Sequence, residues 1–506
     1  MPQKKHFVDY EPVTRSAMPE TVDGADRDGW SEVSWSESDS VSSGIGATGS
    51  QGEMSASPAA VKAAKNGPTR NQVLKRGHGL SFAGLFLFTV VVYFRPYELF
   101  SWLSWATSMA FVIAMLTLIV YVPTQLGLEG NITYRPREVN LVLLLLLMAA
   151  LSVPLSFDRT IAWNAFAEFL KVIVMFIVMV NVVRTEKRLR VMILLALITS
   201  CILAAAAVND YRLGNFMKDL SHNRIRGFIG NLFDNPNDLA LHLVTMIPLA
   251  VGLLLGARAG LKKLFFAGCT LLIGAGVVAT FSRGGFVGLV CVGAVLAWRL
   301  SKSNKFLIAA GLPTALVLFV VLAPSGYGTR LATTADESGV ARRQELKRSL
   351  FVAVHHPLLG IGMNNYPLYS NINRATHNAY TQVASEIGFP AMALYILFLI
   401  APLKGLRRII RKTSEVRRSS RFYYLAVGLE ASLVGYMVCS FFLSVAYLWY
   451  LYYLAGYAIC YRRLYEASQI EESGQATLRK GTAEEKPSNP NRVPQLESVP
   501  TFSLNQ

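Results

Sequence analysis

Three histidines and several arginines lie in one polar stretch, residues 324–377, between two long apolar runs. His355 and His356 precede a proline, and His377 is followed by Asn378 directly before the next apolar run. A histidine whose pKa lies near neutrality suits general-base work. An arginine binds oxyanions through two parallel N–H donors and keeps its charge. These residue types predict a site that combines a general base with cations for a diphosphate-like anion.

The 324–377 stretch contains an amphipathic helix over 345–354, which ends before Pro357 because proline forbids continuation. Adjacent helical positions diverge by about 100°, so Arg342 and Arg343 do not both face one site. The apolar stripe begins at Leu346, one turn after Arg342, which favours Arg342 as the functional residue. The predicted stripe consists of Leu346, Leu350 and Val354.

A second arginine, Arg283, lies in the motif Phe281-Ser-Arg-Gly-Gly285 between two apolar runs. An arginine at a membrane is costly unless it faces a partner or a wet cavity, and the glycine pair permits a tight turn. We predict that Arg283 binds the anion; the alternative is a snorkelling arginine on a hairpin turn. The motif Asp234-Asn-Pro-Asn-Asp238 is predicted to open a helix with Pro236 in its first turn. Its candidate N-cap residues are Asn235 and Asn237.

Five further residues are predicted to contact substrate around this centre. His356 is a candidate contact, although an imidazolium at a helix end also suits the helix dipole. Arg224 and Arg226 would extend the basic rim, with a solvated loop as the alternative. Asn378 adds a polar donor beside the candidate base. Glu386 either orients another group or has a buried structural role.

The elements that must position these residues are apolar. The chain of 506 residues is 52% hydrophobic and 16% charged, with a mean hydropathy of +0.37, whereas soluble domains carry roughly 25% charge. Most of its apolar stretches approach the ~20 residues that cross a bilayer. We predict an all-α polytopic membrane bundle of about twelve transmembrane helices. The stretches cover 80–94, 100–122, 139–154, 161–183, 189–208, 238–256, 264–281, 285–300, 305–323, 378–402, 422–443 and 445–461.

Basic side chains concentrate in alternate gaps between these stretches, in the positive-inside pattern. This pattern predicts that both termini are cytoplasmic and that the 324–377 loop lies on the opposite, outer side of the membrane. It also excludes a nucleic-acid binder or a soluble enzyme. Residues 1–75 and the tail 466–506 are polar and predicted to be disordered, which leaves 80–461 as the membrane domain. The basic gaps contain Lys75/Arg76, Arg135/Arg137, Arg184–Arg190, Arg258–Lys263, Arg299–Lys305, Lys404–Arg421 and Arg462/Arg463.

Motifs for other chemistries are missing from the sequence. The five cysteines lie in apolar runs and form no CxxC knuckle, and no HExxH, GxSxG or DxD motif occurs in the polar loop. We therefore expect no metal site and no cofactor.

In order and spacing, these motifs resemble the O-antigen ligase and O-antigen polymerase superfamily of bacterial inner membranes. The resemblance covers about residues 225–400, and the topology extends it over most of 80–461. Nine residues separate His377-Asn378 from Gly388, and Arg342 stands fourteen positions before His356. Two positions depart from the family pattern. Ala391 replaces a glycine, and Leu346 stands where such proteins often have tryptophan.

The resemblance implies a metal-independent glycosyltransferase that moves a glycan from undecaprenyl diphosphate to an acceptor hydroxyl at the periplasmic face of the inner membrane. By the same resemblance, His377 is the general base, and Arg283 and Arg342 bind the leaving diphosphate. The lead hypothesis is a ligase with lipid A–core as acceptor. A polysaccharide polymerase and a protein O-oligosaccharyltransferase share these motifs.

A twelve-helix transporter or flippase is the alternative from another class of protein. It would have the same topology and net charge, and Glu168 and Lys171, three residues apart, could pair inside its bundle. Transporters usually place ionisable residues at mid-membrane in repeated halves. Here the polar residues gather at one face and no convincing repeat is visible, which favours an enzyme.

Overall fold

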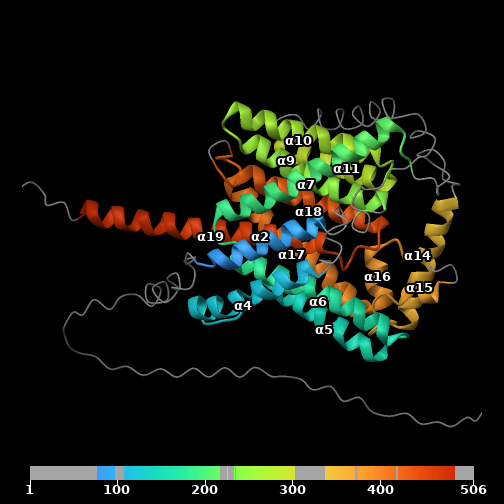
Figure 1. Ribbon diagram of the computed structural model, residues 1–506. Helices are drawn as coiled ribbons and strands as arrows, with labels where there is room; N and C mark the ends of the chain where they lie inside the picture. Colours follow the sequence, from blue (N-terminus) through green and yellow to red (C-terminus); the bar gives the residue numbers. More distant parts are fainter. Residues whose placement is uncertain are drawn as a thin grey trace, which may run out of the picture. The chain divides into compact units, whose positions relative to one another are not determined.

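The computed structural model describes residues 77–96, 108–216, 225, 233, 235–301, 337–370, 374–417 and 420–484 (Figure 1). These residues form α-helices, short 3-10 turns and connecting loops, without a strand among them. The predicted all-α polytopic fold is confirmed. The predictions for residues 1–75, for the stretch 305–323, and for Arg224 and Arg226 lie outside the described residues.

The helices before residue 302 are α2 (Gly79–Phe94), α4 (Met109–Glu129), α5 (Arg137–Ser152), α6 (Arg159–Val182), α7 (Glu186–Leu213), α9 (Pro236–Gly256), α10 (Gly260–Ala279) and α11 (Arg283–Leu300). The helices after residue 336 are α14 (Glu337–His355), α15 (Tyr366–Tyr369), α16 (Ala379–Glu386), α17 (Phe389–Thr413), α18 (Tyr423–Cys439) and α19 (Trp449–Glu484). Two 3-10 turns, η3 (Val153–Leu155) and η4 (Ser440–Phe442), follow α5 and α18.

Within the described residues, nine helical segments are long and apolar enough to cross a membrane. They correspond to nine of the twelve predicted stretches. The stretch 80–94 forms α2, which has 16 residues, and the stretch 445–461 ends inside α19. The total of twelve stays a prediction.

Two boundaries differ from the sequence prediction. The stretch 378–402 is not one helix, because the chain breaks at Gly388, whose φ of 102° favours glycine, before Pro390 in the first turn of α17. The helix α19 continues to Glu484, well past residue 466, where the tail was predicted to begin. Residues 466–484 contain four Glu, three Ala and two Gln, which favour helix even when polar.

The helices α9 and α18 form the centre of the bundle. In each of them, 72% of the 18-residue apolar segment is buried inside the protein, whereas in α4 only 17% is buried, so α4 lies at the periphery. They approach closely because Gly428 faces the backbone of α9, where a Cβ would lie 2.5 Å from the Pro248 carbonyl oxygen. Small residues allow such contact between membrane helices, where van der Waals packing drives association.

The loops meet at two ends of the bundle. The first, called the site end, joins segments 153–158, 280–285, 357–370, 374–388 and 440–446. The second, called the basic end, joins segments 128–138, 184–190, 299–301, 404–417, 420–421 and 462–466. At the basic end Arg421 lies 3.2 Å from Glu186, and the Arg417 guanidinium donates to the Leu300 carbonyl at 3.2 Å. The described parts of five predicted basic gaps lie at this end, those at Arg135/Arg137, Arg184–Arg190, Arg299–Lys305, Lys404–Arg421 and Arg462/Arg463.

Candidate functional site

The site end is built around the turn that follows α14. Figure 1 shows α14, α15 and α16 gathered together. The turn forms backbone hydrogen bonds with the break between α16 and α17, so the two segments behave as one unit. These bonds run from Ile361 N–H to Ser385 O at 3.0 Å, from Gly362 N–H to Glu386 O at 2.9 Å, and from Phe389 N–H to Pro357 O at 2.8 Å.

Two glycines make this contact possible. Gly360 has φ 61° and Gly388 has φ 102°, both in the region that favours glycine. A Cβ on Gly360 would collide with the backbone of Glu386, and a Cβ on Gly388 would collide with the backbone of Leu358. These two glycines therefore allow the two backbones to pack face to face.

His377 stands where this unit meets the loop after α18. Its backbone lies in the left-handed region, with φ 51°, a conformation that histidine adopts more readily than most residues. Its N–H donates to the Ser444 hydroxyl at 2.9 Å, and the Thr376 hydroxyl lies 2.8 Å from the same oxygen. These contacts hold the backbone that carries the imidazole, and the side chain is half-buried.

Asn378 is the N-cap of α16. Its side-chain oxygen accepts from the N–H groups of Tyr380 and Thr381 at 2.9 and 3.0 Å. The residue is 2% exposed, and capping satisfies N–H groups that the first helical turn leaves unpaired. This geometry gives Asn378 a structural use that sets the direction of the chain at His377.

Charged groups of α14 set the electrostatics of the imidazole. Burial, and then the positive charge of Arg342, lower the pKa of His377 below its ordinary value. Glu345 opposes this effect by raising the pKa, and Arg374 adds to the lowering. Because burial and two cations outweigh one carboxylate, His377 is neutral at pH 7 and its ring keeps a nitrogen lone pair that accepts a proton.

On α14, the face turned toward His377 carries Arg342 and Glu345. Arg342 is half-buried and Arg343 is exposed, which agrees with the prediction from spacing. Glu345 is 1% exposed and accepts from the Tyr366 hydroxyl at 2.9 Å. The sequence analysis did not select Glu345 or Tyr366. Glu345 lies three residues after Arg342, and that i, i+3 spacing was the signal available.

The apolar stripe of α14 does not form the buried face of the helix. Leu350 and Val354 are 51% and 60% exposed. Besides Glu345, the buried side chains are instead Ser349, Val352 and Ala353, whose modest size lets α14 approach α16. The predicted helix is present, but its polar and small-residue face, and not the apolar stripe, makes the contact within the protein.

Arg283 is the first residue of α11 and is half-buried. The preceding Ser282 caps α11 by accepting from Gly285 N–H at 3.1 Å, and it donates to the Asn237 side-chain oxygen at 2.8 Å. Asn235 caps α9 as predicted, with Pro236 in the first turn. The two motifs that the sequence analysis read separately are thus joined by a hydrogen bond.

The start of α11 also borders the segment that holds His377. A Cβ on Gly284 would lie 3.1 Å from the Cβ of Phe442, two residues before Ser444. The Cys439 thiol lies 3.6 Å from the Gly284 carbonyl oxygen. Arg283 and His377 therefore flank one short segment, residues 439–444, at the site end.

The other candidates occupy different positions. His356 is exposed, and its nearest aromatic neighbour is Tyr369, 6.2 Å away between ring centroids. Glu386 is 2% exposed, its Oε2 atom has no hydrogen-bond partner in the described part of the chain, and burial raises its pKa to about 7. That position fits the structural alternative better than a direct contact with substrate. No group of three potential metal ligands occurs among the described residues.

The fold and the site define a class: a polytopic all-α membrane protein with a histidine–arginine centre at one end of its bundle. Residues 268–396 match the family described as O-antigen ligase, and this match confirms the resemblance to that superfamily. The family indicates a glycosyltransferase-type enzyme. The matched range contains Arg283, Arg342 and His377. No curated protein matches the chain.

Proposed function

We propose that this protein transfers a glycan from undecaprenyl diphosphate to an acceptor hydroxyl, with lipid A–core as the acceptor, at the periplasmic face of the inner membrane. The observation that carries the proposal is the environment of His377. A neutral imidazole stands beside Arg342, and the segment that holds it also borders the helix start of Arg283. Displacement of a diphosphate requires both a base and cations.

In this reaction a ring nitrogen of His377 accepts the proton of the acceptor hydroxyl. The oxygen then forms a bond to the anomeric carbon, and the bond from that carbon to the diphosphate oxygen breaks. Arg283 and Arg342 bind the leaving diphosphate and offset its negative charge, which is a large catalytic effect where water is excluded. The proton stays on His377 until it passes to solvent or to the product. The residues need no metal ion for these steps.

The positions of the polar residues support an enzyme over a transporter. The pair Glu168 and Lys171 forms an ion pair at 2.6 Å, but the two side chains are 73% and 51% exposed on the outer surface of α6. A transport site at mid-membrane would require such a pair inside the bundle. The pair therefore gives no support to the transporter.

The acceptor decides between a ligase and its relatives. The purified protein would be incubated with an undecaprenyl-diphosphate-linked oligosaccharide, with and without lipid A–core, and the products analysed by mass spectrometry. We expect glycan on the core. Longer glycan chains that are still attached to undecaprenyl diphosphate would show that the protein is a polymerase and not a ligase. If an intact, membrane-inserted protein transfers no glycan, the proposal that it is a glycosyltransferase is contradicted.

A further inference from the structure

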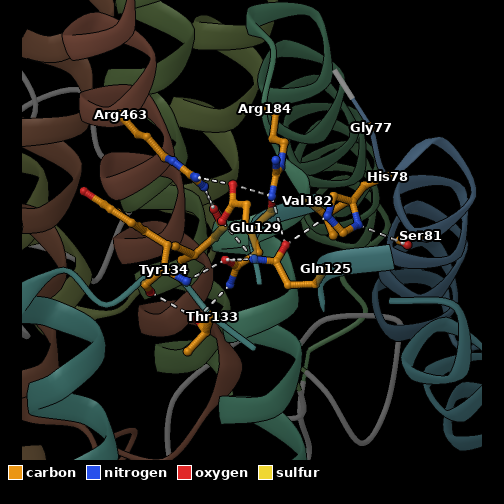
Figure 2. A network of polar contacts seen from close by, with 12 residues as sticks. Gly77, His78, Ser81, Gln125, Glu129, Thr133, Tyr134, Val182, Arg184 and Arg463 are labelled. Carbon is orange, nitrogen blue, oxygen red and sulfur yellow. Dashed lines mark hydrogen bonds and ion pairs between the residues drawn. The ribbon is translucent and has the colours of Figure 1, made fainter. Parts of the chain in front are cut away.

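A network of buried polar side chains stabilises the basic end, far from His377. Figure 2 shows Glu129 at its centre, between Arg184 and Arg463. The Glu129 carboxylate lies 2.8 Å from Arg184 and 3.1 Å from Arg463, and it accepts from the Gln125 amide at 2.9 Å. The Arg463 guanidinium also lies over the ring of Tyr134, 4.5 Å from its centroid. The network fixes α4, α6 and α19 to one another.

This network forms one wall of a cavity of about 1480 Å³. The other walls are the connection between α4 and α5, residues 128–137, the last turns of α17, and residues 462–470 of α19. Phe389 and Lys404 lie fifteen residues apart on α17, so a rise of 1.5 Å per residue puts roughly 23 Å between their backbones. The cavity is therefore separate from the site end.

Cations line this cavity in excess of anions. Of the two carboxylates in its lining, Glu129 is bound by two arginines and Glu466 lies 3.9 Å from Arg462. Five exposed cations have no carboxylate or hydrogen-bond partner among the described residues, and they come from two different walls of the cavity. They are Arg135 and Arg137 before and at the start of α5, and Lys404, Arg408 and Lys412 on one face of α17.

The cavity also has an apolar approach. Leu128, Ile132, Ile409 and Ile470 contribute to its lining, and Ile132 is 63% exposed. The outer face of α4 leads to this rim through a series of exposed apolar side chains, which are Phe111, Val112, Met115, Leu116, Ile119, Val122 and Leu126. A ligand with an anionic head and hydrocarbon chains matches both surfaces, because the head would meet the cations and the chains would lie along α4.

We propose that this cavity binds the headgroup of an anionic phospholipid. The phosphodiester binds to the unpaired cations of α17 and of the segment before α5, and the acyl chains lie against α4. Basic residues between membrane helices attract anionic headgroups in this way. The positive-inside pattern alone requires only that cations lie at this end. It does not require five unpaired cations to converge on one cavity.

The test measures lipid binding to the full-length protein in detergent, by native mass spectrometry and by thermal shift. Phosphatidylglycerol is compared with phosphatidylcholine, and two soluble probes, inorganic phosphate and glycerol 3-phosphate, represent the head without chains. We expect saturable binding of phosphatidylglycerol and a roughly thirtyfold loss of affinity in the double variant Lys404→Gln, Arg408→Gln. A second double variant, Arg135→Gln with Arg137→Gln, removes cations from another wall and should lose affinity too.

The control is the double variant Lys262→Gln, Lys263→Gln, which removes the same charge from exposed positions that do not line the cavity. Its affinity should stay within about twofold of the wild type. Equal losses in the control and the cavity variants would overturn the proposal, as would equal binding of phosphatidylcholine. Full stabilisation by inorganic phosphate or glycerol 3-phosphate would assign the cavity to a soluble anion instead.

Discussion

The imidazole of His377 owes its neutral form to its neighbours. Burial and the Arg342 guanidinium disfavour the protonated ring, and Glu345 partly compensates. The same arginine that would bind the leaving diphosphate thus also keeps the base ready to accept a proton. In the proposed mechanism, this pair of side chains, one on α14 and one in the loop before α16, would couple the binding of the anion to the activation of the acceptor.

This coupling has a measurable pH dependence. The base acts only when neutral, so kcat/KM should rise with pH through the pKa of His377, which lies below 6.5. In Arg342→Gln the loss of a cation raises that pKa and moves the rising limb to higher pH. In Glu345→Gln the loss of an anion lowers the pKa and moves the limb to lower pH.

The quantity to compare is the pH at which kcat/KM reaches half of its maximum on the acidic side. The maximum itself is not compared, because Arg342→Gln should also lower the maximal rate. Profiles of kcat/KM from pH 4 to 9 would be recorded for the wild type and both variants. Limbs that coincide, or that move in the same direction, would show that the acidic limb belongs to another group.

At the scale of elements, the short helix α16 positions His377, the proposed base. Its cap, Asn378, follows His377 directly, and its last turn packs against the turn after α14. The cap uses two hydrogen bonds from a nearly buried side chain. The orientation of His377 therefore depends on the start of a helix of eight residues, which tertiary contacts must hold because so short a helix is unstable alone.

We expect Asn378→Ala to lower the free energy of unfolding by about 1 kcal/mol and to lower kcat more than it raises KM. The physical reason is that the cap holds the backbone of His377 and leaves the bound substrate largely unchanged. Asn378→Asp and Asn378→Ser keep a capping oxygen and should restore most of both quantities. Thermal unfolding and steady-state kinetics measure the two effects. A rise in KM alone would assign Asn378 to substrate binding.

The sequence predicted these elements unevenly. Hydropathy located nine described spans, because a bilayer requires long apolar helices, and Pro357 marked the end of α14. The apolar stretch 378–402 continues through Gly388, so hydropathy alone did not predict the break before α17. Gly388 and Pro390 together were a signal for that break. Ser444, which accepts from His377 N–H, left no signal at all, because that hydrogen bond joins residues 67 positions apart.

At the scale of the whole molecule, the site end depends on packing that is fixed at the basic end. Glu430, a buried acid for which the sequence offered no account, lies 2.6 Å from Arg299 and 2.8 Å from Arg407. These three residues come from α18, α11 and α17, and the last two helices begin beside the candidate site. The ion pairs therefore hold together helices whose opposite ends carry or border functional residues.

Glu430→Gln should lower the free energy of unfolding by about 1.5–3 kcal/mol, because hydrogen bonds to charged groups contribute that much. The variant removes the carboxylate that pairs with Arg299 and Arg407. Both arginines reach solvent in part, so the loss should stay below that of a fully buried pair. Thermal unfolding in detergent measures the change. The control is Glu415→Gln, which is exposed and has no ion pair in the described residues. Equal melting temperatures for Glu430→Gln and the wild type would show that these ion pairs contribute nothing.

Glycan transfer by His377→Ala tests the central claim most directly. The variant would be compared with the wild type and with His355→Ala, a matched control in which an exposed histidine of the same loop is removed. We predict that His377→Ala loses transfer by about 10² to 10⁴-fold, the range for a general base, while both variants insert and unfold like the wild type. Transfer by His377→Ala at the wild-type rate, in a protein of normal stability, would contradict the account.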